Sequence, residues 1–142
     1  MVYLYKRKDR KLKNIEKKKG VIAYSSGNHG QAVSYASKIL GIDSLVVMPK
    51  DAPKIKLENT RKYGAKIVLF NRLIESREEI AMAIAKKSGR VLIPPFDDLD
   101  IIIGQGTAGL EIANKLNEKK IKPDVFLCCC SGGGLIAGTS SY

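Results

Sequence analysis

This sequence has few cysteines and no long hydrophobic run. Its three cysteines are consecutive, Cys128–Cys130. Adjacent cysteines match neither the spacing of zinc ligands nor that of a disulfide framework. No apolar run is long enough to cross a membrane, and no segment has the pattern of a signal peptide. These absences favour a reduced, cytoplasmic protein and predict no metal and no membrane partner.

Acidic residues are also scarce, and the resulting positive charge is uneven. The 142 residues carry a formal net charge of +11. Residues 1–20 hold nine Lys and Arg against Asp9 and Glu16, so most of the excess lies there. A basic end of this kind is either a solvated terminal segment or an arm for nucleic acid. We predict the solvated segment and no nucleic-acid partner, because no nucleic-acid-binding motif accompanies the charge.

From residue 20 to residue 95, short apolar runs alternate with amphipathic segments of helical length. This alternation predicts an α/β fold with a parallel sheet flanked by helices, joined by right-handed crossovers. The runs are continuously apolar, as in sheets covered on both faces. The expected strands are 21–24, 44–48, 65–70 and 90–93, and the expected helices are 31–40, 53–63 and 74–87.

The pattern changes after residue 95. A polar connection, 96–100, should lead to a helix ending near residue 116, and a further strand is expected at 124–130. We therefore divide the chain into a basic segment 1–20, a small α/β domain 21–95 and an incomplete larger portion 96–142. An unfinished sheet would leave apolar surface and an open edge at 124–130, which would favour association.

The segment Ser25–Gln31 (SSGNHGQ) stands between the first expected strand and the first expected helix, and it contains the only histidine of the chain. A strand–turn–helix junction directs backbone N–H groups and a positive helix end into the crevice at the carboxyl edge of the sheet. Gly27 and Gly30 permit close approach of the backbone. This segment is our first candidate site.

Residues 104–109 satisfy the pattern G-x-G-x-x-G, but we do not assign them to a dinucleotide. The apolar run before them has only three residues, and Asp124 precedes its expected strand, whereas a ribose-binding acid belongs at the end of a strand. The alternative is close packing of a helix through its glycines.

The second candidate site is the glycine-rich run Ser131, Gly132, Gly133, Gly134 and Leu135. An apolar segment that enters consecutive glycines and then a helix can bind phosphate, because its backbone N–H groups form an anion-binding nest. A flexible tail is the alternative for such a turn.

Together these motifs resemble the fold-type II pyridoxal-phosphate enzymes. Ser25–Gln31 is similar to the asparagine loop of the threonine/serine dehydratase and serine racemase family, and 131–138 to its phosphate loop. Gly104–Thr107 also has a counterpart there. The resemblance covers about Val21 to Gly138. It implies pyridoxal 5'-phosphate as cofactor and a tryptophan-synthase-beta-like fold.

The resemblance also implies roles for individual residues. Asn28 would bind the cofactor ring, and residues 131–135 its phosphate. Ser25, Ser26 and His29 would surround the substrate carboxylate and Cα, with Ser26 transferring a proton. Arg77 would lie on the substrate side, although an ordinary surface arginine of a helix is the alternative for that residue.

The implied activity is β-elimination of a hydroxy amino acid to a 2-oxo acid and ammonia, or racemisation of serine, by an enzyme that is a homo-oligomer in the complete family. The family's Schiff-base lysine lies in a Phe-Lys-x-Arg-Gly motif, and none of Phe70, Phe96 and Phe126 precedes a lysine here. We therefore expect an inactive fragment. A non-catalytic anion-binding α/β module remains the alternative.

Overall fold

The computed structural model describes residues 12–25 and 27–141, so Ser26 and the first part of the basic segment 1–20 lie outside the described residues. Its centre is a four-stranded parallel sheet with the strand order β3-β2-β1-β4. The α/β fold expected from the alternating pattern is confirmed. The strands are β1 (Val21–Tyr24), β2 (Ser44–Pro49), β3 (Lys66–Phe70) and β4 (Val91–Ile93).

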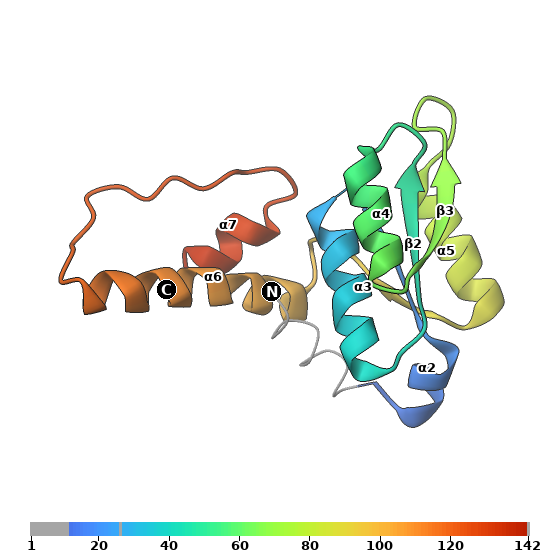
Figure 1. Ribbon diagram of the computed structural model, residues 1–142, viewed down its shortest axis with the longest axis horizontal. Coiled ribbons are helices and arrows are strands. Elements are labelled where there is room, and N and C mark those ends of the chain that lie inside the picture. Colours follow the sequence, from blue (N-terminus) through green and yellow to red (C-terminus); the bar gives the residue numbers. More distant parts are fainter. Residues whose placement is uncertain (1–11, 26, 142) are drawn as a thin grey trace.

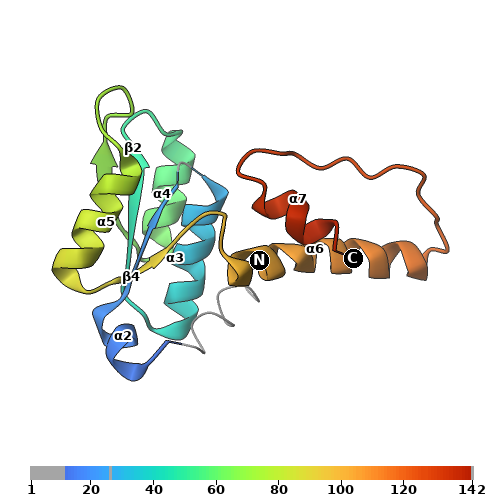
Figure 2. The ribbon, with the colours of Figure 1, turned by 180° about the vertical axis from the view of Figure 1, so that it is seen from behind.

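Helices cover both faces of this sheet, as Figures 1 and 2 show from opposite sides. Helices α3 and α4 pack on one face and α5 on the other, while α2 precedes β1. Two further helices, α6 and α7, lie mostly beyond the sheet. The helices are α2 (Asn14–Lys19), α3 (Asn28–Leu40), α4 (Lys54–Lys62), α5 (Arg77–Ser88), α6 (Leu99–Glu118) and α7 (Gly134–Thr139).

The core follows from the alternation of side chains along the strands. On β1, Val21 and Ala23 pack in the cluster that includes α3, whereas Ile22 packs in the cluster that includes α5. On β2, Val46 and Val47 divide between the two faces in the same way. All five side chains are at most 1% exposed. Two covered faces explain why these strands are apolar at every position.

Helix α5 begins three residues later than the sequence pattern suggested. Residues 71–75 form a turn instead, in which the Asn71 carbonyl accepts hydrogen bonds from the N–H groups of Ile74 and Glu75. The Ser76 hydroxyl then caps the helix by accepting the Glu79 N–H at 3.2 Å. A serine cap with acidic residues after it is a stronger start signal than apolar spacing.

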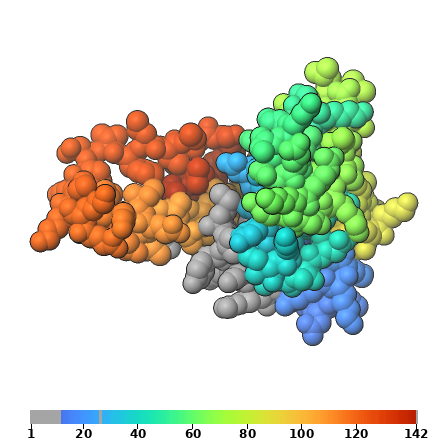
Figure 3. All heavy atoms as spheres, viewed as in Figure 1, coloured from blue at the N-terminus to red at the C-terminus, as the bar shows by residue number. Residues whose placement is uncertain are grey.

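We call residues 96–141 the C-terminal arm, because they project from the sheet region, residues 20–95 (Figure 3). Helix α6 begins at Leu99, inside the expected polar connection, because the Asp98 carboxylate accepts the Ile101 N–H at 3.2 Å and caps it. The G-x-G-x-x-G residues therefore lie within a helix. A dinucleotide loop is incompatible with that position.

Those glycines pack α6 against α7. A Cβ built on Gly109 would lie 2.5 Å from the Thr139 carbonyl oxygen, and one on Gly138 would lie 2.6 Å from the Gly106 nitrogen. Only glycine allows backbones to approach so closely. The interpretation of residues 104–109 as helix-packing glycines is confirmed.

The prediction of a strand at 124–130 is wrong. This segment is irregular, and among the described residues it pairs with no strand of the sheet. Val125 and Leu127 are 73% and 89% exposed. An apolar run becomes a strand only when another strand accepts its backbone hydrogen bonds, and no strand lies beside it here. The apolar surface expected at this segment is present.

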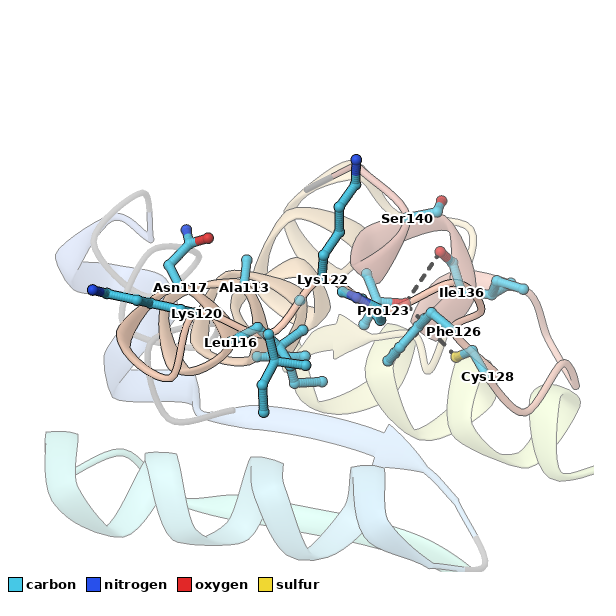
Figure 4. Close-up of a pocket in the computed structure, with 14 residues that line it drawn as sticks. Ala113, Leu116, Asn117, Lys120, Lys122, Pro123, Phe126, Cys128, Ile136 and Ser140 are labelled. Carbon is cyan, nitrogen blue, oxygen red and sulfur yellow. Dashed lines mark hydrogen bonds between the residues drawn. The ribbon is translucent and has the colours of Figure 1, made fainter.

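An apolar cavity of about 810 Å³ lies between the irregular segment 124–130 and the two helices of the arm (Figure 4). Leu116, Phe126 and Ile136 are among the residues that line it. It shares no lining residue with Ser25–Gln31 or with residues 131–135. Among the described residues, no helix combines the length and the apolar character that a membrane span needs.

Candidate active site

The strand order places a topological switch point between β1 and β4, and we call this position at their carboxyl ends the β1–β4 crevice. The chain builds outward from β1 through β2 to β3, and then returns to add β4 on the other side of β1. In parallel α/β sheets, ligands bind where the winding direction reverses, at the carboxyl ends of the strands. The segment Ser25–Gln31 follows β1 at that edge, so the fold places the first candidate motif at the expected binding position.

Hydrogen bonds fix the backbone of this loop. The Ser25 side chain is 8% exposed, and its hydroxyl accepts the Gly27 N–H at 3.1 Å. Gly30 is buried, and a Cβ built on it would lie 3.0 Å from Val46 Cγ1 and 3.4 Å from Ser25 Cβ. The loop therefore lies directly on the end of the sheet and needs glycine to do so.

His29 joins the two strands that flank the crevice. Its Nε2 lies 3.1 Å from the carbonyl oxygen of Ile93, the last residue of β4. A carbonyl oxygen accepts only, so Nε2 carries the hydrogen of this bond. The ring is held in one orientation over the β1–β4 crevice, which suits a residue that contacts a ligand there.

Asn28 lies in the first turn of α3 and is exposed to solvent. The thirteen-residue helix behind it contributes a positive end to the same position. Ser26, the candidate for proton transfer, lies outside the described residues.

Arg77 lies beside Tyr24, the residue before the loop. Its guanidinium carbon is 5.5 Å from the centroid of the Tyr24 ring, and its Nε donates to Glu78 Oε1 at 2.7 Å. Both Arg77 and Glu78 border a cavity of about 320 Å³ at the ends of β2 and β3. The structure thus brings Arg77 to the carboxyl edge of the sheet.

Two pKa values near Arg77 are perturbed. Burial raises the pKa of Tyr24, and the negative charges of Glu78 and Asp97 add to this increase. For Glu78, burial acts to raise the pKa, but the hydrogen bond and charge of Arg77 and further hydrogen bonds bring it below its ordinary value. Arg77 and Glu78 therefore form an ion pair at this edge.

The glycine run 131–135 packs against Phe96, the first residue of the C-terminal arm. A Cβ built on Gly132 would lie 2.1 Å from Phe96 Cδ1, and one on Gly134 would lie 3.3 Å from Phe96 Cβ. Gly133 has a φ of +82°, a conformation that favours glycine. Phe96 follows Ile93 by three residues, so residues 93–96 contact both the His29 loop and the glycine run.

Sequence reasoning did not single out Phe96, Tyr24 or Lys56. Lys56, on α4, reaches over the loop: a Cβ built on Gly27 would lie 2.8 Å from its Nζ. None of the three has a local signal, because each becomes relevant only when separate segments meet. Among the described residues, no group of His, Cys, Asp and Glu could hold a metal ion.

Comparisons with known proteins identify the family of this chain. The family model described as "Pyridoxal-phosphate dependent enzyme" matches residues 1–142. The chain belongs to this family. Its members and the relatives named below depend on pyridoxal phosphate, so the cofactor expected from the resemblance is confirmed for the family.

The relatives include lyases and racemases. L-threo-3-hydroxyaspartate ammonia-lyase of Saccharomyces cerevisiae is 42% identical over 130 residues, which are 92% of this chain and 39% of that protein. Serine racemase of Arabidopsis thaliana is 45% identical over 122 residues, which are 86% and 36% of the two chains. This chain therefore spans less than half the length of these relatives.

Solved structures match the fold closely. The T.th. threonine deaminase superposes with a TM-score of 0.84 at 42% identity, covering 99% of this chain and 44% of that one. Maize serine racemase gives a TM-score of 0.84 at 37% identity, covering 96% and 40%. The expected family and fold class are both confirmed.

The described residues fit the family's cofactor. Phosphate binding needs accessible backbone N–H groups, and Gly132–Gly134, which pack against Phe96, have no side chains of their own that could cover these groups. The first N–H groups of α7 precede the first intrahelical bond and so have no partner within the helix. The exposed amide of Asn28 supplies a polar group at the end of β1.

Proposed function

We propose that this chain forms the cofactor- and substrate-binding edge of a pyridoxal-phosphate-dependent ammonia-lyase acting on threonine or serine. The observation that carries the proposal is the placement of Ser25–Gln31 at the β1–β4 crevice, with His29 fixed on Ile93 at 3.1 Å. The family match and the relatives support the reaction class. Residues 21–95 would be the small domain, and 96–142 part of the larger one, in a homo-oligomeric enzyme.

Each residue then has a defined task. Gly132–Gly134, with Ser131 and Leu135, hold the phosphate, and Asn28 orients the pyridine ring. Ser25, Ser26 and His29 surround the carboxylate and Cα of the amino acid, with Ser26 exchanging the Cα proton. Arg77 lies on the substrate side of the site. When bound, pyridoxal phosphate stabilises the negative charge that develops at Cα.

The catalytic lysine is the part that these 142 residues do not provide, because they contain no Phe-Lys-x-Arg-Gly motif. Loss of a covalent nucleophile costs orders of magnitude in rate. We therefore expect this chain, given pyridoxal phosphate and L-threonine, to release no ammonia. Ammonia release at an enzymic rate would show that another lysine of this chain acts as the Schiff-base lysine.

Cofactor binding tests the proposal without relying on turnover. The probe is pyridoxine 5'-phosphate, which has no aldehyde and does not react with surface lysines. We expect the chain to bind it more tightly than pyridoxine, as measured by calorimetry. Gly132→Val should abolish this preference, because the new side chain would occupy the space of Phe96.

The matched control is Ala137→Val, on the exposed face of α7, which should bind like the wild type. Equal binding of the two vitamers would contradict the assignment of residues 131–135. The alternative function, a serine racemase, predicts the same preference for pyridoxine 5'-phosphate. It differs in its product, which would be the other enantiomer of serine and not a 2-oxo acid. A chain that binds inorganic phosphate as tightly as pyridoxine 5'-phosphate would instead be an anion-binding module.

A further inference from the structure

Lys56 is the cation that α4 brings to the Ser25–Gln31 loop. A Cβ built on Gly27 would lie 2.8 Å from Lys56 Nζ, 3.6 Å from its Cδ and 3.7 Å from its Cε. The last half of the lysine side chain therefore lies along the loop backbone. It is partly buried there, whereas Lys54, two residues earlier on the same helix, is exposed.

A second contact fixes α4 against the loop. The Asn59 side-chain amide donates to Gln31 Oε1 at 3.2 Å. Lys56 and Asn59 are three residues apart, so they lie on the same face of α4. One reaches Gly27 and the other Gln31, so this face follows the loop along most of its length. Helix packing thus holds the backbone of Lys56 beside the loop, within reach of Gly27 for its side chain.

The charge of Lys56 has no counter-ion among the described residues. None of the ion pairs or side-chain hydrogen bonds in that part of the structure involves its ammonium group. Asp51, five residues before Lys56 in the chain, pairs with Arg72 at 2.9 Å. The loop beneath Lys56 begins a helix and adds positive potential of its own. Two sources of positive charge therefore meet at one end of α3, an arrangement that attracts an anion.

We propose that Lys56 binds the α-carboxylate of the amino-acid substrate over the Ser25–Gln31 loop. This inference rests on the proposed function, which places the substrate at that loop. The cofactor phosphate is not the anion, because the glycine run 131–135 in the C-terminal arm already provides a site for it. Lys56 is then a substrate-binding residue supplied by α4, outside both recognised motifs.

A pair of stable conjugates tests this contact. N-(5'-phosphopyridoxyl)-L-serine carries ring, phosphate and carboxylate, and N-(5'-phosphopyridoxyl)ethanolamine lacks only the carboxylate. We expect the wild-type chain to prefer the serine conjugate. Lys56→Gln should lower affinity for that conjugate about tenfold, as loss of a charge-assisted hydrogen bond does, and leave the ethanolamine conjugate nearly unchanged. Lys54→Gln is the matched control and should change neither.

The outcomes separate the two proposals. If neither conjugate binds to the wild-type chain, the proposed function fails. If both bind and Lys56→Gln weakens them equally, Lys56 supports the loop and does not contact the carboxylate, so the inference is overturned. Lys56→Arg should retain most of the preference for the serine conjugate, because it keeps the charge. Raising the salt concentration should reduce that preference in the wild type and not in Lys56→Gln.

Discussion

The sheet region and the C-terminal arm contain equally apolar segments that are buried to very different extents. In the sheet region, Ile22 and Val47 are 0% exposed between helices on both faces. In the arm, Val125 and Leu127 are 73% and 89% exposed. Composition does not explain this contrast. The strands of the sheet region have neighbours within the chain, and the segment at 124–130 has none in the described residues.

The contrast shows how differently helices and strands depend on their surroundings. Helix α6 closes its hydrogen bonds within itself and needs only a close-fitting partner, which α7 provides over Gly106 and Gly109. A strand forms its hydrogen bonds only with another strand. The arm therefore contains its two expected helices, whereas the expected strand at 124–130 does not form.

The largest expected effect comes from removing a buried side chain of the sheet region. Ile22→Ala deletes atoms that are 0% exposed on a central strand, and should lower the free energy of unfolding by about 2–5 kcal/mol. The matched change in the arm is Leu127→Ala, which should lower it by less than about 0.5 kcal/mol because the side chain is 89% exposed. Urea denaturation followed by circular dichroism measures both.

Similar losses in the two variants would remove the contrast between the regions. A large effect of Leu127→Ala would mean that residues 124–130 are covered in solution, either by another copy of the chain or by another polypeptide. The concentration dependence of the denaturation midpoint distinguishes an intermolecular cover from an internal one.

A smaller effect, confined to the arm, should follow from Gly138→Val. Its Cβ would lie 2.3 Å from the Ile102 carbonyl oxygen and 2.6 Å from the Gly106 nitrogen, and both are backbone atoms that cannot rotate away. We expect a cost of about 1–3 kcal/mol. Hydrogen exchange should become faster in α6 and α7 and stay unchanged in β1 and β2.

Ala137→Val provides the control, because residue 137 is exposed on the same short helix. It introduces the same side chain without the backbone clash. Faster exchange in the strands of Gly138→Val would indicate that the arm and the sheet region unfold as one unit.

The sequence was sufficient for those parts of the fold that depend on local and repeated signals. The apolar runs and their intervening helices predicted the order of elements in the sheet region, with ends shifted by a few residues. The start of α5 was missed because Ser76 acts as a cap only if residues 71–75 turn first. The strand at 124–130 was predicted wrongly because the apolar pattern does not reveal whether a neighbouring strand exists.

The same distinction applies to the site. Ser25–Gln31 and residues 131–135 could be found because each is a continuous motif at a strand or helix boundary. The contacts of His29 with Ile93 and of Lys56 with Gly27 join residues separated by 64 and 29 positions, respectively. Such pairings follow from helix packing and strand order, which a single sequence does not specify.

The smallest effect we predict concerns the amino edge of the sheet, where Asp43 joins three strand ends. Its carboxylate pairs with Arg90, and Lys66 Nζ lies 3.4 Å from the same oxygen. Arg90 also donates to the carbonyls of Val21 and Asp43 at 3.3 and 3.2 Å. The hydrogen bond from Arg90 is the main reason that the pKa of Asp43 lies below its ordinary value of 3.8, despite partial burial that acts to raise it.

A lowered pKa in the folded state means that the Asp43 carboxylate stabilises the sheet region above pH 3.8 and that this contribution is lost as the pH falls through the folded pKa. Because the side chain is 43% exposed, solvent screening limits the contribution to about 1 kcal/mol or less. Asp43→Asn should therefore lower the free energy of unfolding slightly at pH 7 and flatten its decline toward pH 3.

The matched control in the arm is Glu118→Gln, whose partner Lys115 is 67% exposed, and it should leave the dependence of stability on pH unchanged. If both variants flatten the profile equally, acid sensitivity is spread over surface ion pairs, and the Asp43–Arg90 pair does not distinguish the sheet region from the arm.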